Sequence, residues 1–178
     1  NAHPWPAARA APFPMPRPAL RGGDPRCMYG GPVGETRRTD EGPALVDTDT
    51  CVGSRACMAA CPYEARYFNW SEPPPVKRMP MPSSPQMPVA RKGTVGKCVF
   101  CADRLPHGEL PACVSGCAMG VLYIGDLVTD IAVNSLGMTV VLSEFLQAND
   151  AVRFKEELGT NPRVYYIAGH GQNLGRGE

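Results

Sequence analysis

Apolar residues occur along this chain in short runs, separated by polar or proline-rich segments. Runs of this length, rich in β-branched and aromatic residues, predict short β-strands at residues 65–68, 121–124, 139–142 and 164–167. Ser143 is expected to cap a short helix, and apolar residues at helical spacing predict a second helix over residues 151–158 that ends at Gly159. No run approaches the roughly 20 apolar residues of a membrane span, and no leading segment resembles a secretory signal. The pattern predicts a soluble α+β chain that could still sit on a membrane-bound partner.

Proline and glycine make this a loop-rich chain. It has 20 prolines and 19 glycines among 178 residues, well above their usual combined share of about 12%. Seven prolines in residues 1–26 predict an extended arm, which either lies on a partner subunit or is a disordered tail. Seven more in residues 71–90 predict a long draped loop. Such a composition cannot build a large regular core.

The charge balance excludes one class of partner. The chain has 18 Lys and Arg against 17 Asp and Glu, a formal net charge of +1, and no basic stripe. We therefore expect no nucleic acid partner. Residues 76–97 carry five basic side chains and no acid, so they either dock an acidic partner, offset the charge of a cofactor, or form a solvated loop.

Cysteines are the other unusual feature of the composition, and they are expected to stabilise a chain that lacks a large core. Eight are present: Cys27 alone, a first group at Cys51, Cys57 and Cys61, and a second group at Cys98, Cys101, Cys113 and Cys117. Disulfides or a structural zinc ion would each use such residues. The first group, however, matches the iron–sulfur run C-x2-C-x2-C-x3-C-P at three cysteines and at the closing Pro62. The spacing therefore favours iron–sulfur ligation over zinc and over disulfides.

Ser54 occupies the second cysteine position of that run. A serine hydroxyl replaces a thiolate poorly, so the iron at this corner is expected to be absent, leaving a [3Fe–4S] cluster. The alternative is a [4Fe–4S] cluster with serine or water on one iron. In such runs the last cysteine, here Cys61, points toward a neighbouring cluster.

The second group spreads four ligands around a looped-out segment, residues 102–112. Together the two groups read CVGSRACMAACPYEARYFNW and KCVFCADRLPHGELPACVSGCAMGVLYIGDL. They resemble the four-cluster ferredoxin subunit of the dimethyl sulfoxide reductase, or complex iron–sulfur molybdoenzyme, family. The extension at residues 128–151 is most similar to the iron–sulfur subunit of alternative complex III, a quinol-oxidising respiratory complex.

This resemblance implies an electron-transfer subunit that is not catalytic alone. It would relay electrons between a quinone-linked membrane subunit and a partner redox subunit, on the periplasmic face of a membrane. The implied partners are a molybdopterin-enzyme-like subunit, an integral membrane quinone-binding subunit and a cytochrome c subunit. The implied division of the chain is a proline-rich arm (1–26), a ferredoxin-like domain with bacterial-ferredoxin-like cluster-binding loops (27–125) and a C-terminal α/β extension (126–178).

The family has four cysteine motifs, and only the last two are in usable form here. Cys27 falls on the third cysteine of motif two, and Gly31, just before Pro32, falls on its fourth. Nothing resembles motif one, so the chain is either a fragment of a longer subunit or a degenerate relative. The resemblance implies that motif three pairs with motif two, and motif four with motif one.

A self-contained pairing is also compatible with the sequence. One [4Fe–4S] cluster would be held by Cys98, Cys101 and Cys113 with Cys61, and one [3Fe–4S] cluster by Cys51 and Cys57 with Cys117. A second class of function also stays open, in which the chain is a structural subunit that binds zinc or nothing. We interpret His107, between the ligands, as a surface residue rather than a ligand.

Overall fold

The computed structural model describes residues 28–38, 44–72 and 90–168. The expected arm at 1–26, most of the expected loop at 71–90, and Cys27 lie outside the described residues. In the part that the structure describes, every strand pairing is antiparallel and the sheets are small. This mixture of small sheets and short helices agrees with the predicted α+β class.

The strands of the described residues form four sheets. Two antiparallel pairs come first, β1 (Thr36–Arg38) with β2 (Ala44–Val46) and β3 (Arg66–Phe68) with β4 (Val95–Lys97). A three-stranded sheet follows, formed by β5 (Tyr123–Asp126), β6 (Ile131–Asn134) and β7 (Thr139–Val141). The last pair is β8 (Val152–Arg153) with β9 (Tyr165–Tyr166).

The helices are short. They are α1 (Ala56–Ala59), α2 (Ala112–Ser115) and α3 (Leu142–Ala148), with 3-10 turns η2 (Leu105–His107) and η3 (Glu156–Leu158). No helix among the described residues is long and apolar enough to cross a membrane.

Most of the predicted strands are confirmed. Strands β3, β7 and β9 fall within the ranges 65–68, 139–142 and 164–167, and β5 begins two residues later than expected. The helix expected from Ser143 is also present, but it begins at Leu142. Ser143 does not cap it, because its N–H and hydroxyl both donate to the Asp130 carboxylate instead.

The helix predicted over residues 151–158 is wrong. That segment forms β8 and then η3, with Lys155 in left-handed backbone at φ 54° between them. Phe154 packs beside Tyr63, with ring centroids 6.4 Å apart. Pairing with β9 and packing on a distant segment thus override the local helical spacing.

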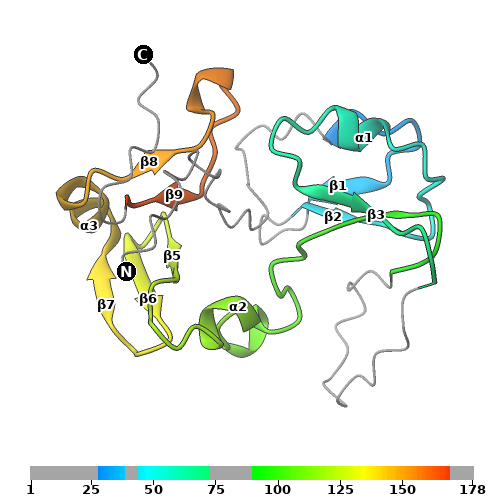
Figure 1. Cartoon of the computed structure of the whole chain (residues 1–178). Coiled ribbons are helices and arrows are strands. Elements are labelled where there is room, and N and C mark those ends of the chain that lie inside the picture. Colours follow the sequence, from blue (N-terminus) through cyan, green and yellow to red (C-terminus); the bar gives the residue numbers. More distant parts are fainter. Residues whose placement is uncertain (1–27, 39–43, 73–89, 169–178) are drawn as a thin grey trace, which may run out of the picture.

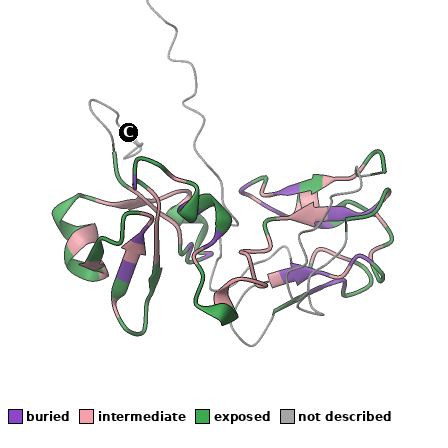
Figure 2. Cartoon of the chain, turned by 90° about the horizontal axis from the view of Figure 1, so that it is seen from below, coloured by how far each residue is buried: buried purple, intermediate pink, exposed green. Residues whose placement is uncertain are grey.

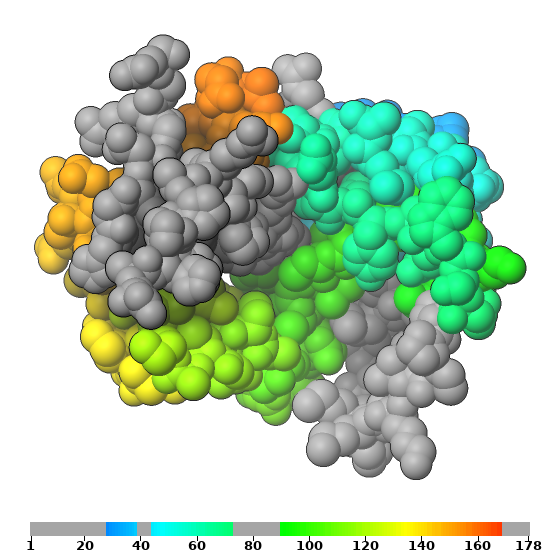
Figure 3. Space-filling view, in the orientation of Figure 1, coloured from blue at the N-terminus to red at the C-terminus, as the bar shows by residue number. Residues whose placement is uncertain are grey.

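The elements gather in two groups with α2 between them (Figure 1). One group contains α1 and β1 to β4, and the other contains β5 to β9 with α3. Buried residues occur in both groups, on β2 and β4 in the first and on β6 in the second (Figure 2). The segment that carries the second cysteine group, green in Figure 3, covers the surface between the two groups on the lower side.

The C-terminal group also docks directly onto the first cysteine group. Cys61 and Tyr63 are buried together, against the partly buried Phe154, Val164 and Tyr166. Tyr63 and Thr160 share a buried hydroxyl–hydroxyl hydrogen bond. The end of the first cysteine motif is therefore part of a core that includes the C-terminal strands.

Candidate iron–sulfur site

The two cysteine groups fold into the same local structure. Helices α1 and α2 each span four residues and carry a cysteine as their second residue. In each group the last cysteine follows four positions later and donates its N–H to the third helical residue. The distances are 3.2 Å from Cys61 to the carbonyl of Met58 and 3.0 Å from Cys117 to that of Val114. The groups are structural repeats, although their earlier cysteines are spaced differently.

Both groups curl through left-handed backbone before their helices. Gly53 and Arg55 have φ of 70° and 61° in the first group, and Phe100 and Cys101 have φ of 60° and 49° in the second. Non-glycine residues seldom adopt this conformation, and it concentrates in ligand-binding loops. Two features disfavour a side chain at Gly53. One is its positive φ, and the other is the carbonyl oxygen of Gly93, with which a Cβ would collide.

Backbone N–H groups approach sulfur atoms in the second group. Phe100 N–H donates to Cys98 Sγ at 3.4 Å, and Ala112 N–H donates to Cys101 Sγ at the same distance. The second contact joins Cys101 to the start of α2, eleven residues later in the chain. The second group therefore directs backbone N–H groups at two of its sulfur atoms.

Cys117 lies in a similar environment. The backbone N–H of Leu122 holds the pKa of the Cys117 thiol below its usual value, with further support from Val121, Met119 and Gly120. These donors all belong to the loop that runs from Cys117 into β5. The local backbone of this loop therefore stabilises negative charge on the Cys117 sulfur.

Cys57 has a different, buried setting. Burial raises the pKa of its thiol, and the nearby Arg66 guanidinium opposes this effect. The charges of Glu35 and Cys51 also act on Cys57, both raising its pKa. Arg66 is itself buried and donates from Nη1 to Thr36 Oγ1 at 3.0 Å. A cation, an acid and two thiols are therefore close together here.

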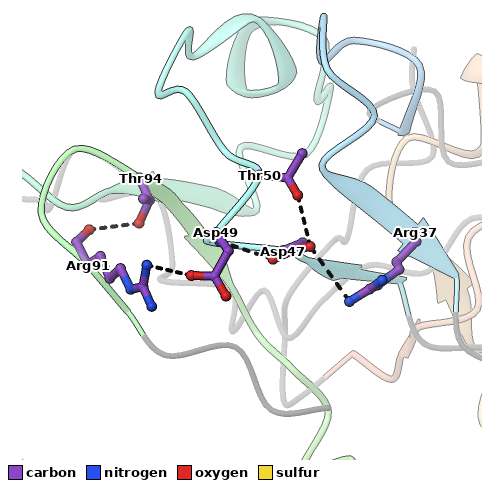
Figure 4. A network of polar contacts seen from close by, with 6 residues as sticks. All are labelled: Arg37, Asp47, Asp49, Thr50, Arg91 and Thr94. Atoms are coloured by element: carbon purple, nitrogen blue, oxygen red, sulfur yellow. Dashed lines mark hydrogen bonds and ion pairs between the residues drawn. The ribbon is translucent and has the colours of Figure 1, made fainter. Parts of the chain in front are cut away.

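The turn that leads into Cys51 is organised by Asp47 (Figure 4). Its carboxylate accepts bonds from Asp49 N–H and Thr50 Oγ1, both at 3.0 Å, and its carbonyl accepts from Cys51 N–H at 3.0 Å. The Asp49 N–H, followed by the Thr50 hydroxyl, holds the Asp47 pKa below its usual value. An ion pair from Arg91 to Asp49 ties the turn to the segment before β4. These contacts therefore fix the backbone position of Cys51 at the end of the turn.

The looped-out segment of the second group is closed by its own contacts. Arg104 Nε and Glu109 Oε2 are 3.1 Å apart across it, and η2 ends at Gly108 with φ 72°. His107 is exposed, as predicted. The segment is thus a compact turn between Cys101 and Cys113.

The seven cysteines of the described residues are all free thiols, at positions 51, 57, 61, 98, 101, 113 and 117. In the same part of the chain, no three His, Cys, Asp or Glu side chains converge on a point that could hold one metal ion. An iron–sulfur cluster places each protein ligand on a different iron, so its ligands need not converge in this way. Thiols with N–H groups directed at their sulfurs fit such a cluster in donor chemistry.

Sequence reasoning missed two buried residues beside the first group, Glu35 and Arg66. A signal for Glu35 was present, because it follows four residues after Gly31, where the resemblance expects a cysteine. Nothing in the local pattern marks Arg66, which lies in the outwardly ordinary strand β3.

Comparison with known proteins agrees with this chemistry. Residues 80–127, which contain the whole second cysteine group, match a family model described as a 4Fe-4S dicluster domain. The iron–sulfur cluster-binding subunit of menaquinone reductase from Nitratidesulfovibrio vulgaris is 34% identical, over 86% of this chain and 65% of the relative. An iron–sulfur protein of Halobacterium salinarum, named for dimethyl sulfoxide reductase, is 37% identical, over 80% and 50%.

A third relative is covered over more of its own length. The iron–sulfur subunit of arsenate respiratory reductase from a Shewanella species is 30% identical, over 83% of this chain and 72% of the relative. The chain belongs to the iron–sulfur subunit family of molybdoenzyme-type respiratory reductases. It spans only one half to two thirds of the length of several other relatives.

Proposed function

We propose that this chain relays electrons through iron–sulfur clusters within a membrane-associated respiratory oxidoreductase. The observation that supports this most is the structural repeat, in which two four-residue helices carry equivalent cysteines and equivalent following turns. Clusters supply one-electron carriers, and this chain's residues hold and shield them. The chain would not be catalytic alone.

The proposed ligands are the seven described cysteines, with Cys27 as a further candidate. In one arrangement a [4Fe–4S] cluster is held by Cys98, Cys101 and Cys113 with Cys61. A [3Fe–4S] cluster is then held, at the loop with Ser54, by Cys51 and Cys57 with Cys117. The N–H contacts to Cys98 and Cys101 support ligation by the second loop. The division into an arm (1–26), a ferredoxin-like domain (27–125) and an extension (126–178) belongs to the same proposal.

The proposed partners are a molybdopterin-enzyme-like subunit, an integral membrane quinone-binding subunit and a cytochrome c subunit, with the chain on the periplasmic face. The relatives named for menaquinone, dimethyl sulfoxide and arsenate reductases support an assembly of this kind. Apolar side chains beside the cysteine groups are widely exposed, namely Val52, Met119 and Val121. Such residues suit burial against other subunits.

Metal analysis of the purified protein tests the proposal. Iron and acid-labile sulfide in similar amounts, with broad absorption near 400 nm, are expected. Colourless protein with stoichiometric zinc would instead favour a structural bridging role.

Expression without partners tests the assignment as a subunit. We expect the chain alone to be poorly soluble or deficient in clusters. A stable, fully loaded monomer would contradict the proposed assembly.

A further inference from the structure

Glu35, directly before β1, is a buried acid. Its residue exposure is 3%, and its carboxylate oxygen Oε2 has no hydrogen-bond partner among the described residues. Burying a carboxylate oxygen without a hydrogen-bond partner is unfavourable on general grounds. A positively charged ligand bound at Oε2 would offset this cost and would explain why the acid is buried here.

The Glu35 carboxylate occupies the side-chain space of residue 31. A Cβ built on Gly31 would collide with both carboxylate oxygens and with Cδ of Glu35. The backbone itself does not require glycine there, because Gly31 is not among the residues with positive φ. The carboxylate thus fills the space that a side chain at position 31 would take, the position where the resemblance expects a cysteine ligand.

This carboxylate lies beside the first cysteine group. The neighbouring Gly30 packs on α1, where its Cβ would lie 2.7 Å from Ala60 Cβ and 3.2 Å from Cys57 Cα. Cys57 is 1% exposed and experiences the charges of Arg66, Glu35 and Cys51. The groups that lower the pKa of Cys117, in contrast, come from the loop of Cys117 itself.

We propose that the Glu35 carboxylate is a protein ligand to the cluster held by Cys51 and Cys57, in the place that Gly31 leaves open. Carboxylate oxygen is an established type of iron ligand in proteins. Three donors, Cys51, Cys57 and Glu35, would serve the three irons of a [3Fe–4S] cluster, while the corner at Ser54 has no iron. The buried Arg66 balances part of the added negative charge. This inference rests on the proposed iron–sulfur function and replaces Cys117 as the third ligand.

The test begins with Glu35→Gln in the assembled complex, because glutamine keeps the size of glutamate but binds iron weakly. We expect the iron of this one centre to be lost and its electron paramagnetic resonance signal to disappear. The centre that includes Cys98, Cys101 and Cys113 should remain and serves as an internal control. Glu144→Gln, at an exposed acid on α3, is the matched control and should leave both signals unchanged.

A second variant keeps the test informative if Glu35→Gln does not fold. In Gly31→Cys combined with Glu35→Ala, the space is emptied and a thiolate is offered. Mössbauer spectra should then show an iron site with sulfur in place of oxygen ligation, and iron content should match wild type.

The outcomes separate the two proposals. Wild-type protein without iron and sulfide would overturn the electron-transfer function itself. Clusters in wild type with unchanged iron and spectra in Glu35→Gln would overturn only the Glu35 ligand. A double variant that folds and retains the wild-type Mössbauer spectrum would do the same.

Discussion

Two basic side chains, those of Lys155 and Arg55, lie close to the first cysteine group. Lys155 donates from Nζ to the carbonyl oxygen of Pro62 at 2.6 Å, and Pro62 directly follows Cys61. Arg55 lies 5.3 Å from the ring centre of Phe68 and 5.2 Å from that of Trp70. Positive charge near a cluster stabilises its reduced, more negative form.

Replacing Lys155 should therefore lower a reduction potential. For Lys155→Met we expect the centre that includes Cys61 to become harder to reduce by on the order of 1 kcal/mol, or about 40 mV, at an effective dielectric constant near 20. Redox titration monitored by electron paramagnetic resonance measures this. Lys92→Met, at an exposed lysine, is the control and should show no shift. A rise in potential on losing Lys155 would contradict the electrostatic argument.

The position of Ser54 leads to a second prediction, about the number of irons in the first centre. Its hydroxyl lies 3.5 Å from Ala56 N, at the edge of hydrogen-bond range, so it serves the start of α1. Ser54→Cys should supply the missing thiolate and convert the centre toward [4Fe–4S]. The three-iron signal of the oxidised protein should disappear, with more iron per chain. An unchanged spectrum would mean that the three-iron centre lies elsewhere.

The hairpin of β6 and β7 holds the second cysteine group in place. Asn134 is 1% exposed, donates to the carbonyl of Gly120 at 2.8 Å, and accepts from Leu136 N–H and Met138 N–H at 3.0 Å each. The neighbouring Ser135 hydroxyl donates to the carbonyl of Cys117. This turn therefore holds the Cys117 loop at two carbonyl groups, those of Cys117 and Gly120.

Removal of the Asn134 side chain should release that loop. Asn134→Ala leaves three backbone groups without these partners, so we expect a loss of about 3 kcal/mol of unfolding free energy. The cluster that uses Cys117 should also lose iron faster to a chelator. Asn149→Ala removes a comparable but exposed bond to Phe145 and should cost less than about 0.5 kcal/mol. Equal effects of the two variants in thermal unfolding would contradict this role.

At the scale of the whole molecule, the two repeats differ in the surroundings of their last cysteines. Cys61 is buried in the core shared with the C-terminal strands, whereas Cys117 is only partly buried in its own loop. In both repeats the last cysteine stands beyond the helix that carries the previous one. These are the positions that serve a neighbouring cluster in ferredoxin runs.

Separate Cys101→Ala and Cys117→Ala variants test the exchange of ligands. We expect Cys101→Ala to damage the centre that its own loop surrounds, and Cys117→Ala to leave that centre intact, because a swapped last cysteine does not bind the iron of its own loop. Iron content and the spectra of each variant in the assembled complex distinguish the two centres. Loss of the same single centre in both variants would instead indicate one four-cysteine site, as in a zinc-type arrangement.

The sequence by itself determined the features that depend on neighbours along the chain. Cysteine spacing is one, because ligands within a few residues must share a loop, and Gly159 is another, because its φ of 66° ends η3 as glycine commonly does. Strands β3 and β7 were likewise visible as short apolar runs.

Only the tertiary structure decided what depends on burial between distant segments. The spacing at 151–158 favours a helix locally, yet docking of Phe154 on Tyr63 and pairing with β9 produce a strand. Glu35 looks like a surface acid in sequence, and becomes a candidate ligand only because folding brings its carboxylate over Gly31. Burial energy is shared among residues far apart in the chain, so a local pattern carries no record of it.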